Sequence, residues 1–525
     1  MFISIKEYRI LLTVPKIQKK YLVQFWLLVI GITAYYYHNT ITEFPMYMHS
    51  WTQSDHYALT IGFTKNGLNL FHPQTYYLNP QIKPVIKQTQ YLGITAADLP
   101  VYDYLAAILM KLFNTRAVAV CRIITLLFAL TGLFCLYKFT FLLTQNNLPS
   151  LFLTVFVFTC PLYNYFQAGF IPTIPSLALT FCAFYFYYLF LRNNSYKQLL
   201  IAIFCLSIAS LARMTFLIYL TALLVHQLLI MFRNKKITKQ ILTYFFAAFA
   251  MIIAYRIYNV YLQKMYGAAF LGSLRPINFK WFADTFMEAY NNWVLHYFTK
   301  WHYILMLLLI VIFIYQIIFR KISLSQNQKL LFELSLIMFF GCTAFYLLMQ
   351  TQFNHDYYFL DSFFALTLLM LILFLSIINW KNKMVLILWA IIFSSFSIFA
   401  FFDCNTTLNA RCGDKTNDMS YQMQLTFRNA NDFLNKIGID NSKNILILNS
   451  YSSNIPFILM DRSGFCVIHW ERDQILEALT LPFDYIIILN KSTNNVFGSV
   501  PELKTLLNPV ANSGRFTVYK ALWKK

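Results

Sequence analysis

WHYILMLLLIVIFIYQIIF, residues 301–319, is an apolar stretch close to the roughly 20 residues that a helix needs to cross a lipid bilayer. A second stretch, YLVQFWLLVIGITAYYY, occupies 21–37, and similar stretches recur as far as about residue 402. Only helices and closed barrels satisfy their backbone hydrogen bonds in lipid, and continuous apolar stretches of this length are typical of helices. The sequence therefore predicts a polytopic α-helical membrane protein.

The composition excludes a soluble protein of this length. Only 12% of the residues are charged, against about 25% in an ordinary soluble domain, and 58% are hydrophobic. The formal net charge of +21 would also suit a nucleic-acid partner, but the Lys and Arg residues form short clusters between apolar stretches. Because that placement is typical of topology signals, we expect contacts with membrane lipids and no nucleic-acid partner.

Basic clusters at 192–197, 233–239, 320–321 and 381–383 mark turns on the cytoplasmic side of the membrane. Two spans should separate each cytoplasmic turn from the next. All clusters fall on one side if the chain has eleven membrane-spanning helices. These are predicted near 21–37, 117–139, 149–165, 172–191, 198–212, 214–232, 238–261, 301–319, 328–349, 357–379 and 384–402.

The segment PVYDYLAAILMKLFN, residues 100–114, decides between eleven spans and twelve. It is too short to cross a bilayer and carries Asp103 and Lys111, so we expect an amphipathic helix at the membrane surface. Basic residues precede the first span and no cleavage site follows it, which predicts a retained helix and a cytoplasmic N-terminus. The C-terminus then lies on the outer face of a cell inner (cytoplasmic) membrane.

Three segments are predicted on that outer face: a first loop at 38–116, a second loop at 262–300 and a tail that begins at 403. The chain thus divides into a membrane domain, 1–402, and an extracytoplasmic domain, 403–525. Cys404 and Cys412 lie near this boundary, where two alternatives remain open, a disulfide or two free thiols.

The tail alternates short apolar strands with more polar helices. Strands are expected at ILIL (445–448), YIIIL (485–489) and FTVYKAL (516–522), and helices at 427–438 and 471–479. Such alternation predicts a small α/β domain. It has no glycine-rich loop of the kind that cradles phosphates.

The first loop carries the motifs WTQSDHYALTIGF (51–63) and ADLPVYDYLAAILMKLF (97–113), and CRIITLLFAL (121–130) opens the next span. Together they resemble the lipid-linked-sugar glycosyltransferases of the GT-C fold, especially the protein O-mannosyltransferase and aminoarabinose-transferase-like branch. RMTFLIYL (213–220) and NHDYYFL (354–360) are similar to later segments of that family. The resemblance implies juxtamembrane helices in the first loop and a polyprenyl-phosphate-linked sugar as donor.

The chain departs from the family pattern at two points. Ala97, Asp98 and Leu99 precede the proline where relatives often have Glu or Glu-Lys, so no lysine contacts the lipid phosphate from that position. Asp55 is followed by His56 and not by a second carboxylate, so one aspartate must do the work of a tandem acidic motif.

Asp55 is the predicted catalytic residue. Sugar transfer to a hydroxyl needs a base that takes the acceptor proton while the anomeric carbon develops positive charge. Asp55 follows the first span, at the depth where an amphiphilic donor presents its head group. The alternative is a solvated loop aspartate without a catalytic role.

The departing phosphate calls for cations near the outer interface, and Arg122 and Arg213 are the predicted substrate-binding candidates. Arg213 could instead mark a tight outer turn by extending its charged end to the interface. Lys65, Lys83 and Lys87 are possible substitutes, with solvent exposure as the alternative.

Five further residues are candidate substrate contacts. His355, Asp356 and Tyr357 lie at the outer end of the tenth predicted span. The His-Asp pair could contact sugar hydroxyls or a metal, and the tyrosine could belong to an interfacial aromatic belt. Asp98 and Asp103 could position the acceptor or cap the surface helix. The histidines of the first loop lack the helical spacing of a zinc site, so we predict neither a metal nor another cofactor.

These inferences converge on an inverting glycosyltransferase. It would move a hexose or pentose from a polyprenyl-phosphate donor to a lipid, glycan or protein acceptor on the outer face. Two alternatives remain: a lipid or glycan transporter (flippase), and an O-antigen-type polymerase or ligase that uses a lipid-diphosphate donor. A transporter would be expected to show internal repeats and broken, charged helices near the midplane.

Overall fold

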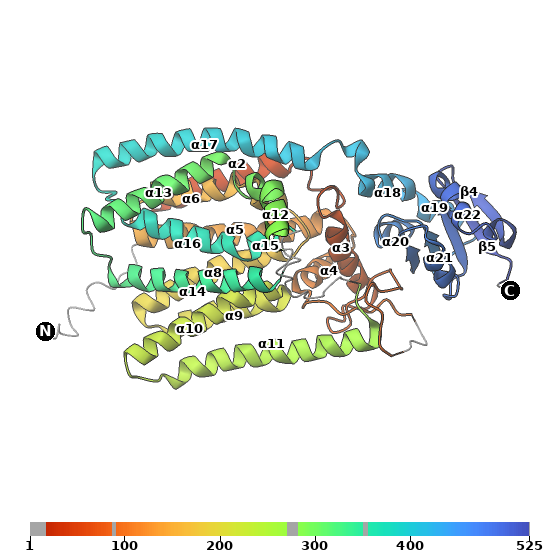
Figure 1. The fold of residues 1–525 in the computed structure, drawn as a ribbon, viewed down its shortest axis with the longest axis horizontal. Coiled ribbons are helices and arrows are strands. Elements are labelled where there is room, and N and C mark those ends of the chain that lie inside the picture. Colours follow the sequence, from red (N-terminus) through yellow and green to blue (C-terminus); the bar gives the residue numbers. More distant parts are fainter. Residues whose placement is uncertain (1–16, 87–90, 270–281, 350–354, 524–525) are drawn as a thin grey trace. The chain divides into compact units, whose positions relative to one another are not determined.

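A computed structural model describes residues 17–86, 91–269, 282–349 and 355–523, and its ribbon is drawn in Figure 1. The chain forms two compact units. The first contains the described parts of Met1–Ile41, Arg122–Tyr255 and Ser273–Ala410. The second contains those of Thr42–Cys121, Arg256–Gly272 and Arg411–Lys525. The predicted domain boundary at 403 kept the first loop in the membrane domain. In the structure, the first loop belongs to the same unit as the tail.

The first unit is built from apolar helices, three of which continue into the second unit at one end. They are α2 (Lys19–Tyr37), α5 (Ala119–Thr144), α6 (Asn147–Phe158), α7 (Pro161–Gln167), α8 (Thr173–Asn193), α9 (Tyr196–Ala212), α10 (Leu217–Arg233), α11 (Lys239–Tyr266), α13 (Lys300–Ile318), α14 (Gln326–Leu348), α16 (Phe363–Ser376) and α17 (Lys383–Cys412). Short η1 (Met214–Phe216) and α15 (Tyr358–Asp361) precede α10 and α16. The polytopic helical fold is therefore confirmed.

Seven described helices are long and apolar enough to cross a membrane by themselves. The pair α6 and α7, bent by 76°, would make an eighth span, and α9 and α16 are shorter apolar helices. Each of the eleven predicted spans thus coincides with a helix or a helix pair. That all eleven cross the bilayer stays a prediction.

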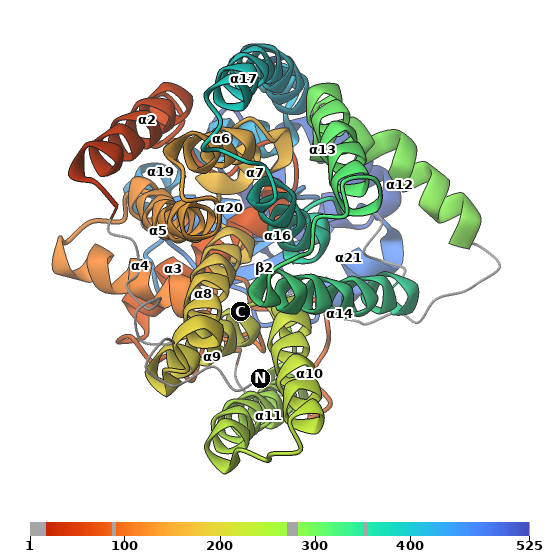
Figure 2. The same ribbon diagram turned by 90° about the vertical axis from the view of Figure 1, so that its left-hand side faces the viewer.

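The membrane helices pack through small residues and aromatic rings. Figure 2 looks nearly along them and shows α8 beside α9, and α14 beside α10 and α16. Gly132 of α5 faces α8 so closely that a Cβ there would lie 2.6 Å from the Cα of Ala178. Close approach of two helix backbones commonly stabilises helix association in lipid, because burial of apolar side chains provides no driving force there.

Helix α12 (Phe282–Tyr297) was not predicted, because its segment was assigned to the second loop. It runs across the bundle direction of the first unit (Figures 1 and 2). Phe286, Met287 and Tyr290 are among its exposed side chains. An apolar face of this kind suits an interfacial helix.

The second unit contains the predicted α/β domain and two helices of the first loop, α3 (Ser50–Lys65) and α4 (Val101–Leu112). The short α4 coincides with the predicted surface helix. The helices of the tail are α18 (Met419–Phe427), α19 (Ala430–Lys436), α20 (Ile455–Met460), α21 (Arg472–Ala478), α22 (Thr493–Ser499) and α23 (Leu503–Leu506).

A five-stranded sheet with the order β2-β1-β3-β5-β4 forms the core of the tail. The strands are β1 (Ile445–Leu448), β2 (Gly464–Val467), β3 (Tyr485–Leu489), β4 (Leu507–Asn512) and β5 (Phe516–Ala521). β1 lies parallel to β2 and β3, while β5 is antiparallel to β3 and β4. The three predicted strands are confirmed. The other two strands, β2 and β4, were not predicted. β2 is too short to show a strand periodicity, and β4 contains Pro509, which is tolerated because β4 is at the edge of the sheet.

The first loop extends this sheet beyond β2. The Leu78 amide donates to the Gly464 carbonyl (2.8 Å), and the Gly464 amide donates to the Tyr76 carbonyl (3.0 Å). The side chain of Asn79 exchanges hydrogen bonds with the backbone of Cys466. Backbone pairing across nearly 400 positions makes the loop and the tail one folded unit.

Candidate functional site

Asp55 lies on α3 with only 4% of its surface exposed. Its Oδ1 accepts a hydrogen bond of 2.7 Å from the Nδ2 of Asn454, a residue of the tail. Burial raises the pKa of the Asp55 carboxyl to about 8, and the hydrogen bond from Asn454 offsets only part of this rise. With this pKa the carboxyl can gain and lose its proton near neutral pH, which is what general-base catalysis requires.

His56, the next residue, turns to a different partner. Its Nδ1 lies 3.1 Å from Oδ2 of Asp103, which is in the first turn of α4. Burial raises the pKa of Asp103, while the charge and hydrogen bond of His56 act in the opposite direction. The N-cap of α4 is Pro100 and makes no side-chain cap, so Asp103 acts on this helix end as a first-turn carboxylate.

Asp98 lies 3.7 Å from the guanidinium of Arg256, and both side chains are more than one-third exposed. Arg256 comes from the last part of α11, within the second unit. Sequence analysis did not single it out, because it sits among apolar residues at the end of a predicted span. A positively charged residue within an apolar span is unusual, and this feature could have identified Arg256 from the sequence.

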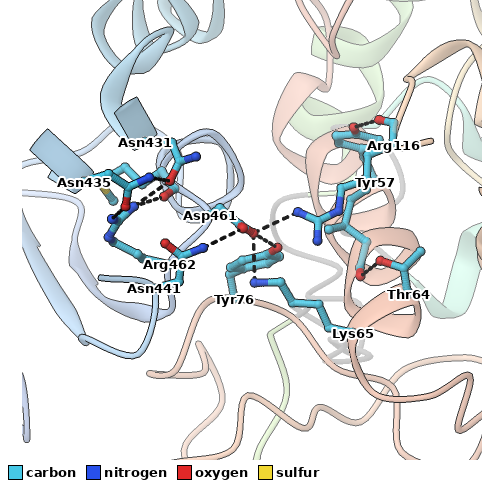
Figure 3. Close-up of polar contacts among 12 residues, drawn as sticks. Tyr57, Thr64, Lys65, Tyr76, Arg116, Asn431, Asn435, Asn441, Asp461 and Arg462 are labelled. Atoms are coloured by element: carbon cyan, nitrogen blue, oxygen red, sulfur yellow. Dashed lines mark hydrogen bonds and ion pairs between the residues drawn. The ribbon is translucent and has the colours of Figure 1, made fainter. Parts of the chain in front are cut away.

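A second carboxylate, Asp461, gathers side chains from the first loop (Figure 3). Its Oδ1 accepts from the Tyr76 hydroxyl (2.7 Å), and lies 2.9 Å from both the Lys65 Nζ and the Arg116 Nη1. Asn441 donates to its Oδ2 (3.0 Å). We call these five residues the Asp461 cluster.

The cluster determines the ionisation of its members. Burial by itself would raise the pKa of Asp461, but hydrogen bonds from Tyr76 and Lys65 and the charges of Lys65 and Arg116 hold it below its ordinary value. Burial lowers the pKa of Lys65, and Asp461 counters this. Lys65 is therefore engaged with a carboxylate, as is Lys83, which pairs with Glu477. Lys87 lies outside the described residues.

Arg213, in the first unit, is not a solvent-directed turn marker. Its Nε donates to Oδ2 of Asp361 (2.8 Å), and its guanidinium lies 5.0 and 4.7 Å from the ring centres of Tyr357 and Tyr358. Asp361 is fully buried. Arg213 Nη2 and Asp361 Oδ1 have no hydrogen-bond partner within the described ranges. Asp361 was not among the predicted site residues, although a carboxylate directly before a long apolar stretch is a recognisable feature of the sequence.

Arg122 and the His355 segment also belong to the first unit. Arg122 donates from Nη1 to the Ala168 carbonyl (2.7 Å), and its guanidinium lies 4.6 Å from the centre of the Phe170 ring. Asp356 is fully buried, and the His355 ring lies 5.4 Å from that of Tyr357. The binding roles predicted for these residues stay predictions.

Cys404 and Cys412 are both free thiols on α17. Helical rise separates them by about 12 Å, whereas disulfide Cα atoms lie about 4.4 to 6.8 Å apart. In the part of the chain that the structure describes, no three His, Cys, Asp or Glu side chains are placed to hold a metal ion. The absence of a metal stays a prediction.

Comparisons with known proteins agree with this architecture. Residues 97–258 match the family model described as dolichyl-phosphate-mannose-protein mannosyltransferase, a stretch that excludes Asp55. The crystal structure of ArnT from Cupriavidus metallidurans bound to undecaprenyl phosphate superposes with a TM-score of 0.59 at 9% identity, over 96% of this chain and 98% of that one. Apo ArnT superposes with a TM-score of 0.50 at 10% identity, over 95% and 97%. No curated protein matches in sequence.

At these identities the ArnT structures establish the fold alone, which is the GT-C fold predicted from the sequence. The family match at 97–258 covers less than half of the chain, so over that stretch the chain is similar to the family.

Proposed function

We propose that the protein transfers one sugar from a polyprenyl-phosphate carrier to a hydroxyl group of a lipid, glycan or protein, on the outer face of the cytoplasmic membrane. The observation that carries the proposal is Asp55, a buried carboxyl on α3 that accepts a hydrogen bond from Asn454 and whose pKa is raised to about 8. The undecaprenyl phosphate bound to ArnT, which has the same fold, supports the donor class.

In the proposed reaction Asp55 acts as the general base. The acceptor hydroxyl oxygen forms a bond to the anomeric carbon from the face opposite the phosphate, and its proton passes to Asp55. The bond from the anomeric carbon to the phosphate oxygen breaks, and its electron pair leaves with polyprenyl phosphate. One displacement of this kind inverts the anomeric configuration.

The departing phosphate would be stabilised by a half-exposed cation. Arg256 fits this role better than Lys65 or Lys83, whose charges are taken up by carboxylates of the tail. Arg256 lies near Asp98 at a distance of 3.7 Å, which is longer than a direct hydrogen bond. Arg122 remains the second candidate.

The test uses purified full-length protein, a panel of polyprenyl-phosphate sugars and a membrane glycolipid extract as acceptor. Wild type should release polyprenyl phosphate, and Asp55→Asn should release about 10²- to 10⁴-fold less. Release only from polyprenyl-diphosphate sugars would favour a polymerase or ligase. Movement of the intact donor across vesicles, without bond cleavage, would favour a transporter.

A further inference from the structure

Asn454 occupies a position where its side chain would ordinarily cap a helix. It is the N-cap residue of α20, and asparagine at that position usually accepts a hydrogen bond from the first turn. Here the side chain makes no such cap. It donates from Nδ2 to Asp55 instead, across the two parts of the second unit.

The contact is fully enclosed and incompletely satisfied. Asn454 is 0% exposed and Asp55 4%. The Oδ1 of Asn454 is buried without a hydrogen-bond partner in the described segments. A buried amide that gives up its helix cap and leaves its oxygen unpaired carries an energetic penalty, which suggests a role beyond packing.

The backbone around Asn454 is fixed by the sheet. The loop at 449–454 follows the carboxyl end of β1, which lies between two parallel strands, where α/β folds commonly place functional side chains. The Ser450 amide donates to the Val467 carbonyl (2.9 Å), and the Ser450 hydroxyl donates to the Ser452 carbonyl (2.8 Å). This loop holds the amide in place against α3.

We propose that Asn454 is a positioning residue for Asp55, and that the tail domain thereby completes the site of sugar transfer. The inference rests on the function proposed above. The amide N–H fixes Oδ1 of Asp55 and favours the carboxylate, which leaves Oδ2 to take the acceptor proton.

The other groups near Asp55 do not provide this donor. On the following position of α3, His56 pairs with Asp103 of α4. From the segment that extends β2, the Tyr77 phenol interacts electrostatically with Asp55, and burial raises the pKa of Tyr77 so far that the phenol stays neutral and adds no charge beside the carboxyl. The ionisation of Asp55 is thus governed by burial and by the Asn454 bond.

The test compares Asn454→Leu with Asn441→Leu. Asn441 makes the same kind of amide-to-carboxylate contact in the same domain, but with Asp461, and it is exposed. In the full-length protein, the carboxyl stretch of Asp55 is isolated as the infrared difference between wild type and Asp55→Asn. Its titration midpoint should lie near pH 8 in wild type, rise by about one pH unit in Asn454→Leu and stay unchanged in Asn441→Leu.

Turnover is then measured with the donor sugar that wild type uses. Asn454→Leu should lower kcat about 10- to 100-fold with KM changed less than about threefold, the range expected for a lost hydrogen bond to a charged group. The acid limb of the kcat/KM profile should move up with the infrared midpoint. A purely structural contact would lower the amount of folded protein and leave that limb in place.

An unchanged infrared midpoint, or a shifted midpoint with unchanged kcat, would overturn the role of Asn454. Neither result touches the proposed function, which fails separately if Asp55→Asn keeps its activity. Asn454→Asp provides a second variant of the same shape. It should raise the midpoint further, because a second carboxyl replaces the donor.

Discussion

Asp55 and Asp461 both join the first loop to the tail domain, yet their surroundings differ in kind. Asp461 is contacted by Lys65, Tyr76 and Arg116 from the loop and by Asn441 from the tail. Among the described residues, Asp55 has one neutral donor, Asn454, and it is more deeply buried than Asp461. The pKa of Asp461 is lowered, whereas that of Asp55 is raised to about 8.

The difference separates a carboxylate that holds structure from one that can exchange a proton. A carboxylate surrounded by cations stays ionised and is a poor base. A buried carboxyl with one neutral donor gains a proton readily and can lose it again near neutral pH. The comparison therefore assigns the two aspartates opposite expected responses to the same substitution.

The largest expected effect is the loss of activity in Asp55→Asn. Turnover should fall by about 10²- to 10⁴-fold, because the base is removed while the shape is kept. Asp461→Asn is the matched control, and turnover per folded molecule should stay within about threefold of wild type. Equal losses in the two variants would erase the distinction between the two aspartates.

The next effect concerns Asp361, a buried carboxylate of the first unit that resembles Asp461 in having a cationic partner. Arg213→Leu should destabilise the protein by roughly 3 to 5 kcal/mol, because it leaves Asp361 buried and unpaired. Thermal unfolding in detergent measures this. The double variant Arg213→Leu with Asp361→Leu should recover most of the stability.

The double variant also separates structure from binding at Arg213. If it folds but releases no polyprenyl phosphate, Arg213 has a role in substrate binding in addition to its ion pair. Full activity in the double variant would remove Arg213 from the predicted site.

Asp461→Asn should destabilise the second unit by about 1 to 2 kcal/mol, since its ion pairs are partly exposed. The lowered pKa of Asp461 fixes the pH dependence. The stabilisation that ionised Asp461 provides is complete above about pH 3.9, the pKa of an aspartate in the unfolded chain. It is lost as the pH falls through the lower pKa of Asp461 in the folded protein. Wild type and variant should therefore converge in stability in acid, and a constant difference would contradict the assignment.

An effect of opposite sign is expected for the stability of Asp55→Asn. The unfolded carboxyl loses its proton near pH 4 and the folded one near pH 8, so wild type loses stability as the pH rises between these values. Asparagine has no such loss. The melting temperature of Asp55→Asn relative to that of wild type should therefore rise from pH 5 to pH 8. A difference in melting temperature that does not change with pH would indicate that Asp55 ionises normally.

Apolar stretches predicted the membrane helices because their length and continuity are imposed by the bilayer, whatever the helices contact. The strands at 445–448 and 485–489 were recognisable because both faces of the central sheet are buried. The family motifs located Asp55 in the loop at 38–116, but they described only the residues that surround it in the sequence.

The partners of Asp55 and Asp461 could not be predicted, because they come from positions far away along the chain. Asn454 lies 399 positions from Asp55, and nothing in the pattern SYSSNIP distinguishes it from an ordinary helix cap. In the sequence, Lys65 has no feature that distinguishes it from a solvent-exposed lysine, whereas in the folded protein it contacts Asp461. Local patterns carry no record of such pairings.

The most direct test of Asp55 as the base is the pH dependence of kcat/KM between about pH 5 and pH 10, for release of polyprenyl phosphate by the full-length protein. The donor is a phosphodiester that does not titrate in this range, so the acid limb reports on the enzyme. If Asp55 is the base, the acid limb should show one ionisation near pH 8. A profile that is already flat above pH 5 would contradict it.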